Sequence, residues 1–266
     1  TCALPIYFTV IGGTLGEYHS MKICRLQDMA IKMKAPLICI NDSGGARIEE
    51  GISSLSGYSG MFLRHTKASG VIPQIAVILG PCSGGACYAP AICDFIFMVK
   101  GTSKMFITGP QVVKTVIGEE ISVEDLGGAD VHSKTSGVNH FLYEKEEDCL
   151  GGVRKLLSYL PQSNEEDAPY EAGIPVDLSK DIVNIVPDNS KKVYDVHDVI
   201  NTMIDRGSFF EVHKNWAKNA VVGFAKMDGD TVGFVANQAN HMGGSLDVNA
   251  SDKMARFIRF CDCFNI

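Results

Sequence analysis

The sequence predicts an α/β protein with largely parallel strands, and three patterns support this fold class. Short apolar runs alternate with segments of helical periodicity through the first half of the chain, as expected for βα crossovers. Two of these runs end in a glycine pair, Gly44-Gly45 and Gly84-Gly85. A further pair, Gly243-Gly244, repeats the setting of Gly12-Gly13 and indicates a second, related unit.

The expected elements of the first half follow one another in a regular order. A strand at residues 8–11 turns at Gly12-Gly13 and leads into a helix over 19–33, whose apolar residues recur every three or four positions. We expect further strands at 37–40, 75–79 and 95–99, and helices at 53–68 and 86–92, the last of uncertain extent because it contains Pro90. Since each helix connects two buried strands, the sheet should be parallel.

A change of composition divides the chain. Residues 161–192 are polar, partly acidic and poor in periodic structure, so we expect a first domain at 1–160, a connection at 161–192 and the start of a second domain at 193–266. The second domain should contain a helix at 196–204, strands at 221–226 and 231–237, and a helix at 251–263 capped by Ser251. This partial repeat stops before any counterpart of the Gly44-Gly45 loop.

Composition and charge exclude several classes of protein. With 45% apolar and 21% charged residues and a net charge of −7, the chain is typical of soluble globular proteins, and a nucleic-acid or membrane-surface role is disfavoured. Nine cysteines without a Cys-x-x-Cys pair indicate reduced thiols, no metal site and a cytoplasmic location. Because Thr1 is not an initiator and Ile266 directly follows a helical pattern, we expect a fragment.

The two glycine pairs of the first domain point to a reaction that develops negative charge. Glycine lets the backbone approach a ligand closely and expose its N–H groups. One crossover separates Gly44 from Gly84, so both loops should lie at the carboxyl ends of neighbouring strands, where α/β sheets bind ligands. The spacing therefore predicts an oxyanion pocket lined by backbone N–H groups.

Other readings of these motifs are weaker. Asp42-Ser43-Gly44-Gly45 is similar to the active-site serine sequence of trypsin-like proteases, but only His19 precedes it and the βα pattern disagrees. Gly80-Pro81-Cys82-Ser83-Gly84 has the spacing of a nucleophile elbow with Cys82 as nucleophile, yet no particular histidine is identified as its base. Arg47 could bind a phosphate or carboxylate, or anchor the loop through Glu49 or Glu50. His132 and His140 are expected to be structural.

Longer motifs carry a family resemblance. The segments are Phe8 to Glu17, Asn41 to Gly51, Gly80 to Ala86, Met105 to Pro110, Glu124 to Ala129 and Asp247 to Lys253. They resemble the carboxyltransferase (beta) subunit of biotin-dependent acyl-CoA carboxylases and decarboxylases. The resemblance extends from Phe8 to Ile266, and residues 1–7 are expected to lie outside the family.

The resemblance implies two crotonase-like (ClpP/crotonase) domains built as a ββα superhelix, which fits the internal repeat. Family members move a carboxyl group between carboxybiotin and the α-carbon of an acyl-CoA, through an enolate held by backbone N–H groups. Carried over to this chain, the enolate site comprises Gly84, Gly85, Gly45 and Ala46. The acyl-CoA site would comprise Ser43, Gly44, Arg47, Ser83, Ala86, Phe106, Thr108, Gly109, Pro110, Gly127 and Gly128, with no metal. The loop for biotin would lie beyond Ile266.

The resemblance also implies partners. Biotin would be carried by a biotin carboxyl carrier protein and charged by a biotin carboxylase, in a homo-oligomer with active sites between subunits. The expected substrate is propionyl-CoA or methylmalonyl-CoA. One alternative is a subunit of a sodium-pumping methylmalonyl-CoA or glutaconyl-CoA decarboxylase, which would meet a membrane decarboxylase subunit, and a transcarboxylase is a third version. A further alternative is a non-catalytic acyl-CoA-binding or assembly fragment.

Overall fold

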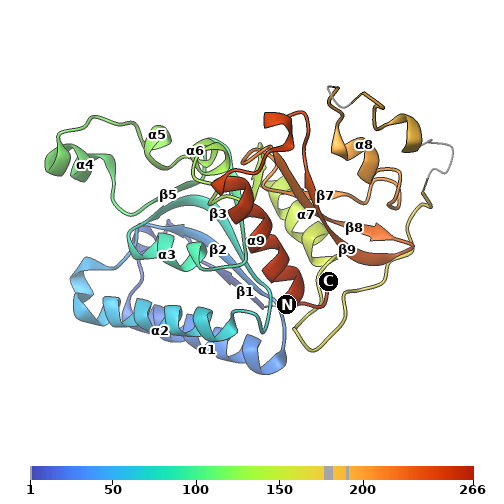
Figure 1. Ribbon diagram of the computed structural model, residues 1–266. Coiled ribbons are helices and arrows are strands. Elements are labelled where there is room, and N and C mark those ends of the chain that lie inside the picture. The colour runs from blue at the N-terminus through green and yellow to red at the C-terminus, as the bar shows by residue number, and fades with distance from the viewer. Residues whose placement is uncertain (1, 177–181, 190–191) are drawn as a thin grey trace. The chain divides into compact units, whose positions relative to one another are not determined.

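The computed structural model describes residues 2–176, 182–189 and 192–266, and its ribbon is drawn in Figure 1. The chain separates into two compact units, residues 1–154 and 155–266. The structural boundary lies between Arg154 and Lys155, within helix α7 (Glu146–Leu157), whereas the sequence places it after residue 160.

The first unit is built on a parallel sheet, as the sequence predicts. Its strands run in the order β1-β2-β3-β4-β6, and β5 pairs with the far end of β3. All five of these strand pairs are parallel. The strands are β1 (Cys2–Pro5), β2 (Leu37–Ser43), β3 (Gln74–Ser83), β4 (Phe95–Val99), β5 (Lys104–Phe106) and β6 (Phe141–Tyr143). The central strands β3 and β4 are almost wholly buried, as strands covered on both faces must be.

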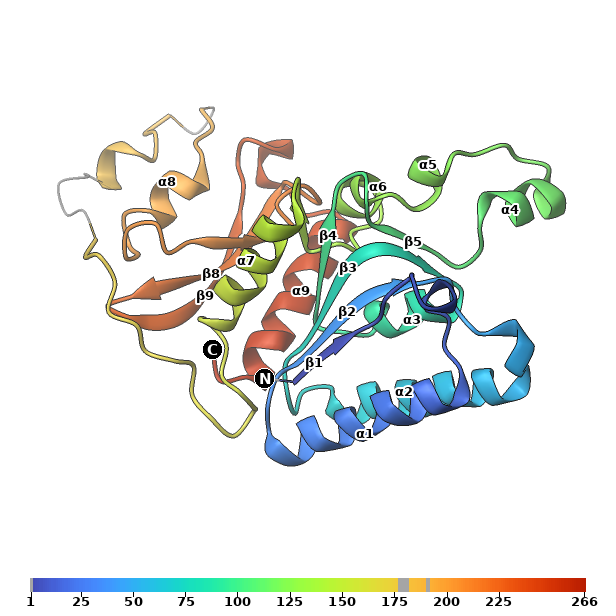
Figure 2. The same cartoon turned by 180° about the vertical axis from the view of Figure 1, so that it is seen from behind.

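Helices cover this sheet and connect its strands. The long helices α1 and α2 lie side by side on one side of the sheet (Figures 1 and 2), and α3 packs on β3. Their apolar stripes contribute Ile23, Ala30, Tyr58 and Met61 to a core that also holds Leu37 and Ile72. The helices are α1 (Glu17–Met33), α2 (Ile52–Ala68), α3 (Gly85–Ala91), α4 (Pro110–Ile117), α5 (Val123–Gly127) and α6 (Ala129–Lys134).

The N-terminal segment corrects the sequence prediction. Residues 8–11 form no strand, because Ile11, Gly12 and Gly13 all have φ between 50° and 63°, which no extended strand allows. The apolar side chains there are exposed, Val10 at 65% and Ile11 at 61%. The first strand is instead β1, and Cys2 pairs with Leu37 of β2. Residues 2–5 therefore belong to the fold, contrary to the expectation for residues 1–7.

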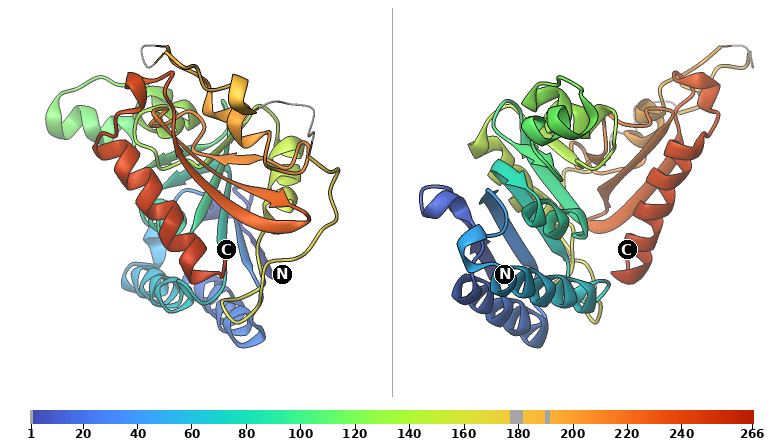
Figure 3. Two further views of the ribbon diagram at one scale, coloured as in Figure 1. Left: turned by 45° about the vertical axis from the view of Figure 1, so that its right-hand side comes forward. Right: turned by 90° about the vertical axis from the view of Figure 1, so that its left-hand side faces the viewer.

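The second unit contains an antiparallel sheet, β7-β8-β9, which Figure 3 shows from two further sides. Its elements are a 3-10 turn (Ile182–Asn184), α8 (Val196–Ile200), β7 (Phe210–Val212), β8 (Ala220–Met227), β9 (Asp230–Asn237) and α9 (Val248–Cys263). Two boundaries differ from prediction. Helix α8 ends at Ile200, four residues early, and Asp247 caps α9 in place of Ser251, since its side chain accepts from the Ala250 N–H.

The internal repeat is present in the backbone. Ile11, Gly12 and Gly13 have φ of 50°, 60° and 63°, and Met242, Gly243 and Gly244 have φ of 51°, 62° and 76°. Each turn is a 3-10 turn, and the helix after it begins five residues beyond its first glycine, at Glu17 in α1 and Val248 in α9. The repeated unit is thus the turn and its helix, while the strands around them differ in direction.

Among the described residues, no helix has both the length and the apolar character needed to cross a membrane.

Candidate active site

Three strands of the first unit end next to one another. In the register of the sheet, Ser43 at the end of β2 stands opposite Cys82 of β3, and Ser83 stands opposite Phe106 of β5. The two glycine pairs directly follow Ser43 and Ser83. The carboxyl edge of this sheet therefore gathers both loops, which is where open α/β sheets bind their ligands.

Serine hydroxyls tie the two loops together. Ser43 Oγ donates to the Gly13 carbonyl at 2.7 Å and accepts from the Gly45 N–H at 3.2 Å. Ser83 Oγ donates to the Gly44 carbonyl at 3.0 Å, which joins the second loop to the first. Both hydroxyls act on main-chain groups, so they fix the shape of the loops.

The backbone N–H groups fall into two classes. The Gly45 N–H is bonded to Ser43, and the Gly84 N–H donates to the Phe106 carbonyl at 3.2 Å. The N–H groups of Ala46 and Gly85 have no acceptor anywhere in the described part of the chain. Of the four residues predicted to hold an oxyanion, Ala46 and Gly85 thus offer available donors, whereas Gly45 and Gly84 shape the loops.

Close packing explains why glycine stands at two of these positions. Gly45 has φ of 104°, and a Cβ there would lie 2.7 Å from the Ser83 carbonyl oxygen. A Cβ on Gly85 would lie 2.8 Å from the ring of Tyr58, a residue of α2 that is 5% exposed. Burial raises the pKa of the Tyr58 phenol, so the ring stays neutral beneath the loop.

Sequence reasoning missed Tyr58 and Ser54, although a signal was present. Together with Met61 and His65 they recur every three or four residues along α2, and all four are buried. The Ser54 Oγ donates to the Leu15 carbonyl at 2.6 Å and accepts from the Arg47 N–H at 3.0 Å. This buried face of α2 therefore packs against both glycine loops, with Ser54 bonded to the first loop and Tyr58 against the second.

Arg47 anchors its own loop. Its guanidinium donates to Glu50 at 2.7 Å and to the Thr14 carbonyl at 3.0 Å. The Glu50 carboxylate also accepts from the Glu17 N–H at 2.6 Å, and these two donors lower its pKa, with the Glu17 N–H the stronger cause. Of the two roles considered for Arg47, the structure shows the anchoring one, through Glu50 rather than Glu49.

The remaining predicted residues lie along β5 and the segment after it. Phe106 closes β5 beside Ser83, and the Ile107 carbonyl is the atom nearest to the open side of Gly84. Thr108 follows, Gly109 caps α4 and Pro110 is its first residue. Gly127 packs on the Met105 carbonyl, and Gly128 forms a bridge to Lys104. Ala86, the second residue of α3, is 6% exposed.

The structure disfavours a side-chain nucleophile. Cys82 is 0% exposed and burial raises the pKa of its thiol, so it is not a thiolate at neutral pH. His132 and His140 have the structural roles expected of them. His132 Nε2 contacts the Met105 carbonyl at 2.7 Å, and His140 Nδ1 accepts from the Ile96 N–H at 3.1 Å. Within the described ranges no group of histidine, cysteine or acidic residues could hold a metal.

The fold and site define an α/β protein whose sheet edge carries two unbonded main-chain N–H groups, on Ala46 and Gly85. The comparisons with known proteins name the class more closely: the chain belongs to the carboxyl transferase domain family, whose profile matches residues 1–266. The match includes residues 1–7, which corrects the expectation that they lie outside the family. The predicted resemblance is confirmed.

Relatives with curated names agree. The chain is 55% identical over 261 residues to the carboxyltransferase subunit of propionyl-CoA carboxylase from Haloferax mediterranei. It is 54% identical to the methylmalonyl-CoA decarboxylase alpha subunit of Veillonella parvula and 52% identical to the human mitochondrial propionyl-CoA carboxylase beta chain. These matches cover 97% of this chain, which spans about half the length of each relative, 51%, 51% and 48% respectively.

Solved structures give the same fold. A transcarboxylase 12S structure, described as a hexamer with methylmalonyl-coenzyme A and methylmalonic acid bound, matches with a TM-score of 0.94 and 49% identity. The match covers 97% of this chain and 50% of the transcarboxylase chain. A single-chain long-chain acyl-CoA carboxylase, 24% identical with a TM-score of 0.84 and covered over 25% of its length, shares the fold. The expected crotonase-like carboxyltransferase fold is confirmed.

Proposed function

We propose that this chain is part of the carboxyltransferase component of a biotin-dependent acyl-CoA carboxylase. The substrate would be propionyl-CoA, with methylmalonyl-CoA as the product of carboxylation. The observation that carries the proposal is the pair of unbonded N–H groups, on Ala46 and Gly85, at the loops of a carboxyl transferase domain. The names of the relatives support the choice of substrate.

The first unit would serve the acyl-CoA. Removing the α-proton of a thioester places negative charge on its carbonyl oxygen, and a preorganised N–H donor aimed at that oxygen typically lowers the barrier by about 2.7–4 kcal/mol. Ala46 and Gly85 would supply such donors. The serine ties between the loops hold them in place before the substrate arrives, so little reorganisation accompanies the reaction.

Carboxybiotin would supply the carboxyl group and would arrive on a carrier protein charged by a biotin carboxylase. The N–H groups of the first unit fit an enolate oxygen, and we assign no residue of this chain to the biotin ring. The hexamer described for transcarboxylase 12S supports the proposal of a homo-oligomer with active sites between subunits. A cytoplasmic location stays part of the proposal.

A second candidate is the same half-reaction in a decarboxylase. The 54% identity to the methylmalonyl-CoA decarboxylase alpha subunit favours it almost as strongly as the carboxylase relatives favour the first candidate. Its partner would be a membrane decarboxylase subunit. Affinity purification of the protein from its native source distinguishes the two: recovery of a biotin carboxylase supports ligation, and recovery of a membrane decarboxylase subunit supports decarboxylation.

The experiment that tests the proposal removes one N–H donor. Proline in place of Gly85 eliminates the donor at the first position of α3, where proline suits a helix, and Tyr58→Leu makes room for the new side chain. The matched control, Gly85→Ala with Tyr58→Leu, keeps the N–H. We expect the proline variant to transfer carboxyl from carboxylated biotin carrier to propionyl-CoA about 100-fold to 1,000-fold more slowly than the control.

The outcomes separate the candidate roles. Equal rates in the two folded double variants would remove Gly85 from the enolate site. A parent protein that binds propionyl-CoA but forms no methylmalonyl-CoA with its carrier would instead support the non-catalytic alternative. The product is identified by mass spectrometry, and circular dichroism confirms that each variant is folded.

A further inference from the structure

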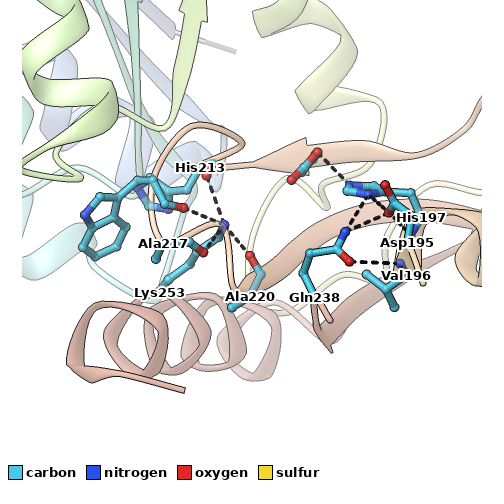
Figure 4. Close-up of polar contacts among 10 residues, drawn as sticks. Asp195, Val196, His197, His213, Ala217, Ala220, Gln238 and Lys253 are labelled. Carbon is cyan, nitrogen blue, oxygen red and sulfur yellow. Dashed lines mark hydrogen bonds and ion pairs between the residues drawn. The ribbon is translucent and has the colours of Figure 1, made fainter. Parts of the chain in front are cut away.

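The second unit buries a lysine that contacts a single loop. Lys253 lies on α9 and is 1% exposed, although lysine is almost never fully buried unless it is paired. Its ammonium donates to four main-chain carbonyl oxygens (Figure 4). They belong to Ala220 at 2.7 Å, His213 at 3.0 Å, Trp216 at 3.0 Å and Ala217 at 3.4 Å.

The side chain is charged at neutral pH. Burial lowers the pKa of Lys253 to about 8, and the Glu211 carboxylate opposes this shift. The protonated form has three N–H bonds to share among the four carbonyl groups. A buried charge is tolerated when such dipoles surround it, so the ammonium and the loop carbonyls stabilise one another.

The loop that Lys253 contacts has a strained backbone. His213 has φ of 55° and Ala217 has φ of 43°, a left-handed conformation that costs energy for residues with a Cβ. The carbonyl oxygens of both residues accept from Lys253. Strained residues persist where surrounding contacts over-determine them, and they concentrate at functional sites.

This loop forms one wall of a cavity of about 230 Å³. Lys214, Asn215 and Lys218 line it from the loop, and Asp195, His197 and Gln238 line it from other elements. The latter group is held by its own contacts (Figure 4): Asp195 to His197 at 2.6 Å, and Gln238 to Asp195 at 2.8 Å. Lys214 and Lys218 extend from the backbone that Lys253 contacts.

We propose that Lys253 is a positioning residue whose ammonium holds residues 213–220 in their strained conformation and thereby places Lys214 and Lys218 on the cavity wall. The proposal concerns the second unit alone and does not depend on carboxyl transfer. A buried lysine can act by filling space or by donating hydrogen bonds from its charge. If Lys253 acted by packing alone, an apolar side chain of similar length could replace it.

Limited trypsin digestion tests the proposal, because Lys214 and Lys218 are exposed but lie in an ordered loop. We compare the full-length protein with Lys253→Met, which keeps the length and loses the charge, and with Lys253→Arg, which keeps the charge. Arg259→Met, which removes a cation from the exposed side of the same helix, is the matched control. We expect cleavage after Lys214 or Lys218 to accelerate about tenfold or more in the methionine variant, the effect of losing one charge-assisted hydrogen bond.

Trp216 gives a second readout, because it is the single tryptophan of these 266 residues. Subtracting the spectrum of a Trp216→Phe version of each protein isolates its emission. We expect a red shift in Lys253→Met, a smaller one in Lys253→Arg and none in Arg259→Met.

Two results would overturn the proposal. One is a folded Lys253→Met variant with the parent's cleavage rate and Trp216 emission, and the other is an arginine variant as open as the methionine variant. If Lys253→Met does not fold, Lys253→Gln, which retains two N–H donors, replaces it under the same criteria. Unfolding of both would show that Lys253 supports the entire unit rather than the loop.

Discussion

The glycines at the candidate site matter mainly because they lack a side chain, which lets neighbouring backbone pack closely. Gly45 combines a left-handed φ of 104° with a neighbouring carbonyl 2.7 Å from the position of a Cβ. The serines on either side bond to main-chain oxygens rather than to a base. The proposed chemistry depends on where the backbone lies, so substitutions that move the backbone should lower activity more than those that remove a polar side chain.

The first residue-scale prediction concerns Gly45→Ala. We expect it to lower the free energy of unfolding of the first unit by about 2–4 kcal/mol, because left-handed strain adds to the clash with the Ser83 carbonyl. Gly151→Ala, at an exposed helical site with no atom within 4 Å of the new Cβ, is the control and should stabilise by up to about 1 kcal/mol. Urea unfolding measures both, and similar values for the two variants would contradict the packing described at Gly45.

Helix α2 links the site to the other end of the sheet. Near its start, Ser54 and Tyr58 support the glycine loops, and near its end His65 is 1% exposed and bonds to Gln74 at the start of β3. His65 Nδ1 lies 2.7 Å from Gln74 Oε1, and Gln74 Nε2 donates to the His65 carbonyl at 3.0 Å. This reciprocal pair fixes the helix against the strand that carries the second glycine loop.

The histidine makes the stability of this contact depend on pH. Burial lowers the pKa of His65 below 6.5, although Gln74 opposes the shift. The unfolded chain therefore binds a proton near pH 6.5 that the folded chain does not, and stability present above this pH is lost as the pH falls. We expect the free energy of unfolding to decrease by up to about 1.4 kcal/mol per pH unit below 6.5.

Urea unfolding at intervals between pH 7 and pH 5 measures this slope. His65→Gln should flatten it, whereas His241→Gln, at an exposed position of the second unit, should not. An unchanged slope in the His65 variant would assign the acid sensitivity to other groups.

Elements with buried apolar stripes could be predicted from the sequence, and those fixed by backbone torsion could not. The strand at 95–99 and the helices α1 and α2 are found within two residues of their predicted starts, because periodicity reports burial directly. The strand expected at 8–11 is wrong because its apolar residues are exposed around a left-handed turn. The cap predicted for α9 is Ser251. The structure places the cap at Asp247, whose side chain accepts from the Ala250 N–H.

At the scale of the candidate site, the motif spacing predicted which loops meet but not which atoms are available. Because the predicted strands are parallel, the sequence alone indicates that Gly44 and Gly84 lie at the same carboxyl edge of the sheet. Which N–H groups stay unbonded depends on contacts from β5 to Gly84 and from Ser43 to Gly45. These contacts depend on register, which no single-sequence pattern specifies.

At the scale of the whole molecule, no disulfide links the residues that the structure describes. All nine cysteines lie in the described residues and are free, six of them buried and Cys263 exposed; that they are reduced in the protein stays a prediction. We expect differential alkylation of the native protein to label Cys263 first and Cys82 only after denaturation. Peptide mass spectrometry measures this, a reductant should leave the melting temperature unchanged, and early labelling of Cys82 would contradict the packing beneath the second loop.

The turn at Gly12-Gly13 and its copy at Gly243-Gly244 have a consequence for how such proteins can be altered. One copy lies beside a parallel sheet and the other follows an antiparallel strand, yet their φ angles agree within 13° at each position. The residues of the turn therefore determine its conformation in both settings. In both copies the helix begins five residues after the first glycine of the turn. We therefore expect a designer to be able to place this turn between sheets of different strand direction and keep its helix start.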